Sequence, residues 1–215
     1  SEKDSCGVGL VANIKGIPSR EIMDDAYLIN SRMDHRGGCG FEENTGDGAG
    51  ILMALPDSFF QEEAKKIKIN LPAFGSYATG NIFLPQDRKE RSYCKKVVEE
   101  IIKSEGQKFL GWRKVPVNPK KANVGPAALD CQPEIQQIFI QKSSKIDQDA
   151  FERKLYLIRK IFTKRLRYKE NLKQSFMFYA CTLSSRLIAY KGMLTPAQLF
   201  PFYPDLEHKK FETHL

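Results

Sequence analysis

The sequence predicts a compact domain of mixed helices and strands, of the α/β or α+β class. Segments with strand and helix patterns alternate along the chain, without internal repeats or low-complexity tracts. The 215 residues, 41% of them hydrophobic, suffice for one substantial core or at most two small ones. We therefore expect one domain.

The first quarter of the chain has a strand, helix, strand, helix pattern. Residues 6–14 predict a strand, and Ser19 is a suitable N-cap for a helix that runs to about Asp34, where glycines 37, 38 and 40 end it. A glycine-bounded apolar run over 49–55 predicts a buried strand, and 57–68 a short amphipathic helix. The inward face of the first helix is expected to carry Ile22, Ala26, Ile29 and Met33.

The middle of the chain continues this alternation. We expect a strand near 76–84, a helix over 88–105 and a strand around 109–112. Residues 116–133, rich in proline, lysine and asparagine, predict a connecting loop. Residues 134–141 predict an inner strand, because apolar side chains occupy both of its faces.

The net charge of +8 is concentrated in the helix that follows. Eight lysines and arginines between residues 153 and 169, with no acid among them, equal the whole excess. The apolar stripe of this amphipathic helix comprises Phe151, Leu155, Ile158, Phe162 and Leu166. The pattern favours a solvated helix face over a nucleic-acid or membrane contact, and no RNA-binding sheet motif or zinc finger supports the latter.

The last quarter predicts a hairpin over 175–192. Residues 176–181 are apolar on both faces, Ser184 and Ser185 can turn, and 187–190 return, so both strands should be covered on both sides. A short helix over 196–200 is expected from Thr195 and Pro196, and no strong pattern follows it.

Composition also bounds the compartment. No run of 18 uninterrupted apolar residues occurs, and the N-terminus lacks the features of a secretory signal, so we expect a soluble protein without membrane contact. The five cysteines are odd in number, irregularly spaced and without a Cys-x-x-Cys pair, which favours a reduced intracellular compartment.

Cys6 is the candidate nucleophile, at the head of an apolar run. A papain-like triad is not indicated, because the only histidines are His35, His208 and His214, two of them in the weakly patterned tail. The other base available to a thiol is its own α-amino group, with a pKa near ~8. That base requires an N-terminal cysteine, so the sequence predicts a precursor from which Ser1 to Ser5 are removed.

Two other patterns point to sites that we do not expect. The glycine loop over 46–50 lacks the last glycine of a dinucleotide fingerprint, has Ile51 in its place, and leads into a strand rather than a helix. A tight turn feeding a core strand explains it. His35 and Cys39 could contact one metal ion, but two ligands without a third do not make a site, so no metal is expected.

Several motifs, taken in order, carry a resemblance to a known family. The segments Cys6-Gly-Val-Gly, Asp34-His-Arg-Gly-Gly-Cys-Gly and Asn44-Thr-Gly-Asp-Gly-Ala-Gly-Ile-Leu resemble the start of the class II glutamine amidotransferase (glutaminase) domain of glutamate synthases. Later segments agree in the same order, among them Phe109-Leu-Gly-Trp-Arg-Lys-Val-Pro and Tyr190-Lys-Gly-Met-Leu-Thr-Pro. The resemblance covers residues 2 to about 206.

The resemblance implies an α+β fold of the N-terminal nucleophile hydrolase type, an αββα four-layer sandwich that is C-terminally incomplete here. It divides the chain into a propeptide-like leader, 1–5, and a glutaminase part, 6–215. By the motif match Cys6 is the catalytic residue that attacks glutamine, forms a γ-glutamyl thioester and releases ammonia. Arg36 and Gly37 match the family's His-Arg-Gly turn, which binds substrate or orients the nucleophile.

The resemblance also implies a larger parent enzyme of glutamate biosynthesis and ammonia assimilation. Ammonia would pass to a synthase region that carries FMN and an iron–sulfur cluster, and no cofactor is expected in this chain. The partners are then glutamine and the remaining amidotransferase and synthase regions, with no nucleic acid or membrane. The expected location is the cytoplasm, or an organelle if the source is eukaryotic.

Parts of the family's site are absent from this sequence. The Arg-Phe-Ser-Thr-Asn and Gly-Asp-Ser segments that hold glutamine, and the Asn-Gly pair of the oxyanion hole, do not occur. We therefore expect little or no glutaminase activity from the 215 residues alone. Two alternatives remain: another class II amidotransferase, against which 190–206 argue, or a non-catalytic binding module whose basic helix docks an acidic partner.

Overall fold

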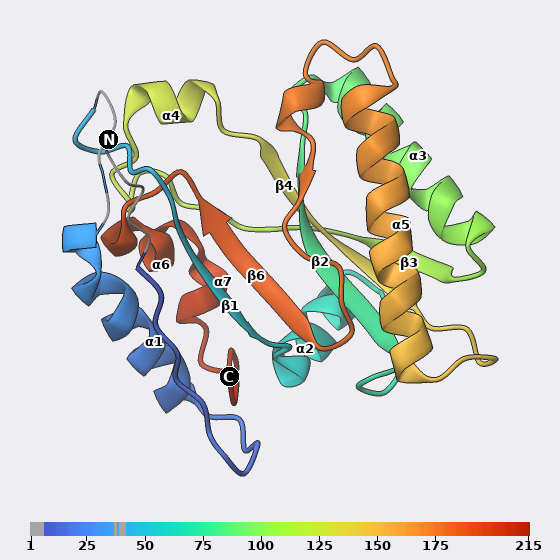
Figure 1. Ribbon diagram of the computed structural model, residues 1–215, viewed down its shortest axis with the longest axis horizontal. Coiled ribbons are helices and arrows are strands. Elements are labelled where there is room, and N and C mark those ends of the chain that lie inside the picture. Colours follow the sequence, from blue (N-terminus) through green and yellow to red (C-terminus); the bar gives the residue numbers. More distant parts are fainter. Residues whose placement is uncertain (1–6, 37, 39–41) are drawn as a thin grey trace, which may run out of the picture. The chain divides into compact units, whose positions relative to one another are not determined.

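The computed structural model describes residues 7–36, 38 and 42–215, and shows two compact units (Figure 1). Residues up to 59, with 116–132 and 189–215, form the first unit. Residues 60–115 and 133–188 form the second. The expectation of a single domain stays a prediction. Among the described residues, no helix combines the length and apolar character needed to cross a membrane.

The second unit is built on a four-stranded sheet in the order β3-β4-β2-β5. β4 is an inner strand, as predicted, and pairs antiparallel with both β2 and β3. The bounds of the strands are Tyr77–Leu84 for β2, Lys108–Lys114 for β3, Glu134–Gln141 for β4 and Tyr179–Ala180 for β5. The first three match the strands predicted from the sequence.

Two amphipathic helices cover one face of this sheet. α3 (Arg88–Ser104) and α5 (Gln148–Tyr168) begin at the N-caps Asp87 and Asp147, whose carboxylates accept backbone N–H bonds. The core between these helices and the sheet contains alternate residues of β2 and β4 and the whole predicted stripe of α5. The five stripe residues, Phe151, Leu155, Ile158, Phe162 and Leu166, have no exposed surface, which confirms the amphipathic helix.

The opposite face of the same sheet carries a row of buried polar side chains. Gln137 of β4 donates to Asn81 of β2 at 2.9 Å and accepts from Arg113 of β3 at 3.3 Å. Arg113 also donates two hydrogen bonds to the Glu63 carboxylate of α2 (Asp57–Lys66), at 2.7 and 3.1 Å. Phe60 of α2 packs edge-on against Phe139 of β4. The row therefore links three strands to a helix, and the bonds that Arg113 donates are charge-assisted.

Because Glu63 belongs to this row, the free energy of unfolding should depend on pH. Burial alone would raise the pKa of Glu63, but hydrogen bonds from Lys66 and Arg113 outweigh it and hold the pKa below its ordinary value. The stabilisation is thus complete above the ordinary carboxyl pKa and is lost as pH falls through the lowered value. Glu63→Gln is expected to cost about 2 kcal/mol at pH 7, and less at pH 3, in urea unfolding. Glu62→Gln, at the more exposed pair of Glu62 with Lys66, should cost less than half of that.

The predicted hairpin over 175–192 is wrong. β5 pairs with β2, whereas β6 (Leu187–Gly192) pairs with β1 (Ala49–Ala54) in a separate two-stranded sheet. Gly80 of β2 lets the backbone of Thr182 approach where a Cβ would overlap it. The Glu152 carboxylate of α5 then accepts from Ser185 N at 2.6 Å and fixes the turn away from β5. The run 176–181 is also not covered on both faces as predicted, because Phe176 is 63% exposed.

The first unit contains the β1–β6 sheet, α1 (Arg20–Arg32) and several short helices. Ser19 caps α1 as predicted and accepts from Ile22 N, but the helix ends at Arg32, before the glycines, and a 3-10 turn, Asp34–Arg36, follows. The short helices are α4 (Pro126–Asp130), a 3-10 helix at Pro196–Gln198, α6 (Leu199–Phe202) and α7 (Pro204–Glu207). The first lies in the predicted loop, and Thr195 and Pro196 begin the second as expected.

An aromatic cluster fixes the tail onto this sheet. Tyr190 of β6 packs edge-on against Tyr203 and Phe211, and Phe211 packs against Phe59. The Tyr190 hydroxyl donates to the Asp205 carboxylate at 2.8 Å. The segment without a sequence pattern is therefore ordered by tertiary contacts.

The predicted strand over 6–14 is not observed. Cys6 lies outside the described residues, and 7–13 form no strand. Within the described part of the chain, the backbone of residues 7–12 has no hydrogen-bond partner, and Asn13 N donates to His214 O at 2.8 Å. An apolar alternation without a neighbouring strand to pair with does not make a ladder.

Candidate functional site

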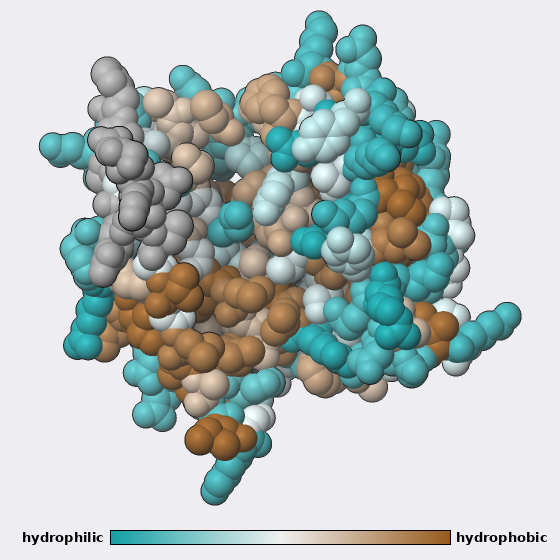
Figure 2. Space-filling view, in the orientation of Figure 1, coloured by the Kyte–Doolittle hydropathy of each residue, from teal (hydrophilic) through white to brown (hydrophobic). Residues whose placement is uncertain are grey.

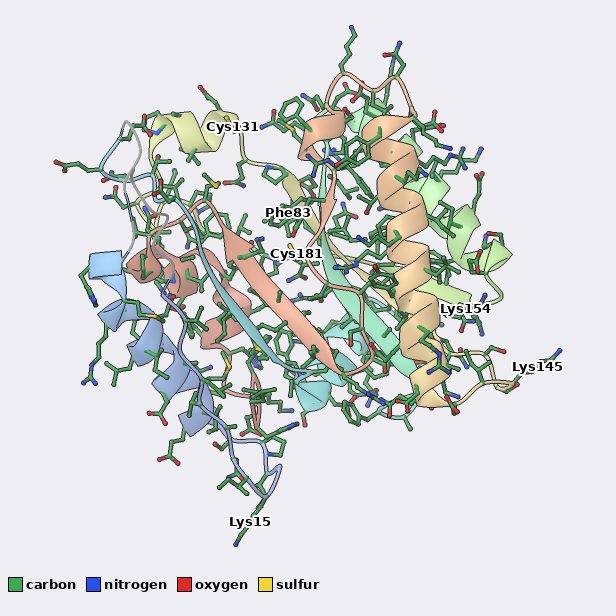
Figure 3. The ribbon with its side chains drawn as sticks, in the orientation of Figure 1. Lys15, Phe83, Cys131, Lys145, Lys154 and Cys181 are labelled. Atoms are coloured by element: carbon green, nitrogen blue, oxygen red, sulfur yellow. The ribbon has the colours of Figure 1, made fainter. Side chains whose placement is uncertain are left out.

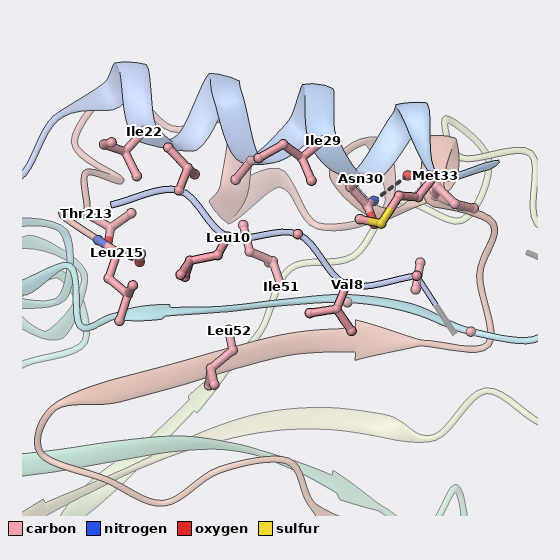
Figure 4. Close-up of a pocket in the computed structure, with 18 of the residues that line it drawn as sticks. Val8, Leu10, Ile22, Ile29, Asn30, Met33, Ile51, Leu52, Thr213 and Leu215 are labelled. Atoms are coloured by element: carbon pink, nitrogen blue, oxygen red, sulfur yellow. Dashed lines mark hydrogen bonds between the residues drawn. The ribbon is translucent and has the colours of Figure 1, made fainter. Parts of the chain in front are cut away.

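A cavity of about 930 Å³ opens in the first unit, between α1 and β1 (Figure 4). One wall is the inward face of α1, with the predicted residues Ile22, Ala26, Ile29 and Met33. The opposite wall is β1 with the glycine loop before it, and the segment 7–11 runs between them. Among the described residues, most of the lining is apolar, and the polar side chains are those of Asn30, Asp47 and Thr213.

Close packing holds the segment 7–11 against α1. A Cβ on Gly9 would overlap the side chain of Ile29, so glycine allows this approach without displacing that side chain. The Asn13 side chain accepts from Lys15 N at 2.9 Å and ends the segment in a turn. Val8 and Leu10 are nevertheless 90% and 80% exposed.

The glycine loop is fixed by backbone contacts on several sides. Gly46 lies against the backbone of Leu194, where a Cβ would overlap it. Gln198 donates to Asn44 O at 2.9 Å, and Asp47 N donates to Gly38 O at 3.0 Å. The loop feeds β1, as predicted, but the strand is half-buried rather than fully buried, since Leu52 is 58% exposed.

Of the three predicted site residues, Cys6 and Gly37 lie outside the described residues. The backbone of Arg36 ends the 3-10 turn, and its side chain is likewise outside the description. The flanking residues are described, and Gly7 and Gly38 both line the cavity. The three motifs that begin at Cys6, Asp34 and Asn44 therefore meet at one place in the fold.

Sequence reasoning missed three polar residues of the lining. Asp47 lies in the glycine loop 46–50, which the sequence predicts only as a tight turn, although the motif that begins at Asn44 includes it. Asn30 reaches the cavity from the last turn of α1 and donates to Pro196 O at 3.0 Å. Thr213 comes from the unpatterned tail. Neither Asn30 nor Thr213 had a sequence signal, because long-range contacts bring them there.

The described residues do not form a metal or cluster site. His35 Nδ1 lies 2.9 Å from Arg32 O, and Cys39 is outside the description. Among the described residues, no three histidine, cysteine or acidic side chains lie together as metal ligands. The cysteines there are Cys94, Cys131 and Cys181, and none of the three is in a disulfide (Figure 3 labels the last two). An iron–sulfur cluster needs several thiolates together, so this set does not fit one.

These thiols should differ in reactivity. Burial raises the pKa of Cys94 to about 12, whereas Cys131 is exposed. Because the thiolate is the nucleophile, the reactive fraction of Cys94 should be about 10³-fold smaller than that of an ordinary cysteine. In timed iodoacetamide labelling with peptide mapping, we expect Cys131 to react well before Cys94. Equal rates would contradict the burial of Cys94, and urea-unfolded protein is the control.

Comparison with known proteins defines the class. The family of class-II glutamine amidotransferases matches residues 6–215, so the chain belongs to this family. The chain is 43% identical to the NADPH glutamate synthase large chain of Bacillus subtilis (strain 168) over 213 residues, 98% of this chain and 13% of that protein. It is 39% identical to ferredoxin-dependent glutamate synthase 1, chloroplastic/mitochondrial, of Arabidopsis thaliana, over 99% of this chain and 13% of that protein.

The NADH glutamate synthase of Saccharomyces cerevisiae (strain ATCC 204508 / S288c) is 36% identical over 100% of this chain and 10% of that protein. The predicted resemblance is thus confirmed. The chain spans about an eighth or less of the length of these relatives.

Proposed function

We propose that this chain is the leading part of the glutaminase domain of a glutamate synthase, with Cys6 as its nucleophile. One observation carries the proposal: glycines next to Cys6 and Gly37, together with the glycine loop of the third motif, line a single cavity. The family match and the similarity to glutamate synthases support the same assignment.

The proposed reaction begins with a free α-amino group on Cys6, after residues 1–5 are removed. That amine takes the thiol proton, and the thiolate attacks the side-chain amide carbon of glutamine. The carbon–nitrogen bond then breaks. The protonated α-amino group of Cys6 returns its proton to the leaving nitrogen, which departs as ammonia. Water then attacks the γ-glutamyl thioester and releases glutamate and the thiol. Arg36 and Gly37 hold the nucleophile or the substrate.

The αββα four-layer arrangement is part of the proposal. Each unit contains one sheet with helices beside it, as that arrangement requires. Ammonia would pass to the synthase region of the parent enzyme, where FMN and an iron–sulfur cluster supply redox chemistry. The proposed location is the cytoplasm, or an organelle in a eukaryote.

The 215 residues alone should have little or no glutaminase activity. The family's oxyanion donor and substrate clamp do not occur in them, and the loss of one such donor costs on the order of 10²-fold or more in rate. Ammonia release by the purified 215-residue protein, after its N-terminus is processed to Cys6, measures this. Turnover at the rate of the full-length enzyme would contradict the expectation.

The proposal is tested first by intact mass and N-terminal sequencing of the full-length protein. A chain that begins at Cys6 and releases ammonia from glutamine supports the mechanism. A chain that still carries Ser1 to Ser5 and is fully active would overturn the α-amino group as the base. A processed or unprocessed chain that never reacts with a glutamine-analogue electrophile would favour a binding module.

A further inference from the structure

A row of cations without acidic partners runs along the outer face of α5. Two other cations of this helix are paired, Lys154 with Glu105 and Arg165 with Glu170, each at 2.8 Å. Within the described part of the chain, no acidic side chain lies within ion-pair distance of the cations in the row. Because each residue turns a helix by about 100°, the four members share one face. We call them the basic row: Arg153, Lys160, Lys164 and Arg167.

The basic row works against the stability of its own helix. Lys160 and Lys164 are four residues apart, and Lys164 and Arg167 are three apart, so their side chains are neighbours on the helix surface. Like charges at these spacings repel each other. The helix dipole favours cations only in the last turn, and Arg153 and Lys160 lie before it. The sequence pattern favours a solvated face here, but the described chain holds no acid that offsets this repulsion.

Exposed aromatic and apolar side chains lie within the row. Tyr156 and Tyr168 are 56% and 75% exposed, and Leu157, next to Tyr156, is 42% exposed. In Figure 2, the surface over α5 is hydrophilic around a small hydrophobic spot. Tyrosine and arginine are enriched at protein–protein interfaces, where the aromatic ring supplies a large contact area. This mixture of side chains favours a protein surface as the occupant.

Two other anionic partners fit the row less well. A single-stranded nucleic acid stacks its bases on free aromatic rings. Arg159 and Lys160 already lie over the Tyr156 ring, at 5.8 and 5.5 Å from its centroid. An amphipathic helix on a membrane inserts its apolar face, but the apolar stripe of α5 is buried in the core of the second unit. An acidic protein surface is therefore the partner that the row favours.

The strength of such a contact selects the source of the acidic surface. Exposed ion pairs are individually weak, so four of them give a Kd no tighter than about 1 mM. A separate protein at micromolar concentration would stay unbound. A region tethered to the same chain has an effective concentration of the order of millimolar, which suffices. The chain spans 13% or less of the relatives described above, so a longer protein of this kind has ample further surface.

We propose that the basic row docks an acidic surface of another region of the longer protein, whose aspartate or glutamate side chains face Lys160 and Lys164. The row spans fourteen residues of helix, or about 21 Å, so the acidic surface should have about this length. The contact would remove the repulsion along α5 and hold the second unit against that region. The inference rests on the proposal that the chain is part of a longer glutamate synthase.

Zero-length cross-linking of the full-length protein tests the contact. A carbodiimide joins a lysine amine to a carboxylate that touches it, and peptide mapping identifies both partners. We expect Lys160 or Lys164 to link to an acidic residue of the same chain outside these 215 residues. Lys15 and Lys145 are exposed control lysines and should give no such link (Figure 3). Links only within the 215 residues, no links, or equal linking of the controls would overturn the proposal.

Two treatments identify the other occupants. In a mixture of unlabelled and isotopically heavy protein, a link between a light and a heavy peptide would assign the row to a second copy. Digestion with nuclease before acetylation would expose Lys160 and Lys164 if a nucleic acid covered them. Either result would overturn the proposal, whereas links within one chain that survive nuclease support it.

Pulse acetylation of the full-length protein is an independent measurement. At about 50 mM salt, we expect Lys160 and Lys164 to react about 10-fold or more slowly than Lys145, and at about 1 M salt at a similar rate, because salt screens exposed ion pairs. Equal rates at low salt, or protection that persists at high salt, would refute the docking. Labelling of Cys6 by a glutamine analogue, with Lys160 and Lys164 unprotected, would leave the proposed function and remove this contact. Protection without any labelling of Cys6 would do the reverse.

Discussion

Replacing Cys6 with alanine in the full-length protein is expected to lower the rate of the proposed glutaminase reaction by about 10⁴-fold or more. Without the sulfur there is no thioester, and water must attack the amide directly. Ammonia release with glutamine measures the loss. A glutamine-analogue electrophile should add one adduct to the wild-type protein, at Cys6, and none to Cys6→Ala.

Cys131→Ala is the matched control for this experiment. Cys131 is an exposed free thiol that follows α4, so its removal should leave both the rate and the Cys6 adduct unchanged. If Cys6→Ala kept the wild-type rate, or if the adduct mapped to Cys131, the assignment of the nucleophile would be wrong. If the full-length protein is the proposed glutamate synthase, ammonia added directly should support its synthase reaction in Cys6→Ala, and this shows that the other regions are intact.

Gly80→Ala should destabilise the protein by about 3 kcal/mol or more. A Cβ at this position would overlap the carbonyl oxygen of Thr182, and a backbone atom cannot move aside as a side chain can. Two backbone hydrogen bonds hold the segment 181–184 against β2. Thr79 N donates to Ser184 O at 3.0 Å, and Cys181 N donates to Asn81 O at 2.9 Å. Thermal unfolding should show Tm lower by about 6 °C or more.

Gly192→Ala serves as the control. Its Cβ would meet only the side chain of Leu194, at 3.2 Å, and this side chain can shift. We expect a change of less than about 1 kcal/mol there. Equal losses for Gly80→Ala and Gly192→Ala would show that the close approach of the Thr182 segment does not govern stability.

Local patterns sufficed for the long helices and for strands β2, β3 and β4 of the second unit. Asp87 and Asp147 cap α3 and α5, and the apolar stripe of α5 is fully buried, as its spacing predicts. The partners of the short strands were not predictable in the same way. The run 176–181 and the run 187–190 look like one hairpin, but β5 joins β2 and β6 joins β1. Strand pairing depends on which backbones can approach one another. Gly80 allows the backbone of Thr182, a residue far along the chain, to approach β2.

The same contrast holds for the candidate site, where motifs predict some residues and tertiary contacts place the others. Motifs close in sequence identified Cys6, Arg36 and Gly37 as candidates, and these stay predictions because the structure does not describe their side chains. The structure adds that their neighbours Gly7 and Gly38 share one cavity with Asp47. Asn30 and Thr213 joined this cavity without any local signal, because helix packing and tail contacts place them.

The sequence by itself determined the family, the long helices α1, α3 and α5 and the strands β2, β3 and β4, since caps, periodicity and ordered motifs are local properties. Only the tertiary structure decided which strands pair, that the tail folds onto Tyr190, and that residues 7–11 line a cavity together with α1 and β1. These features depend on backbone hydrogen bonds and close contacts between residues far apart in the chain, and no local pattern encodes such partners.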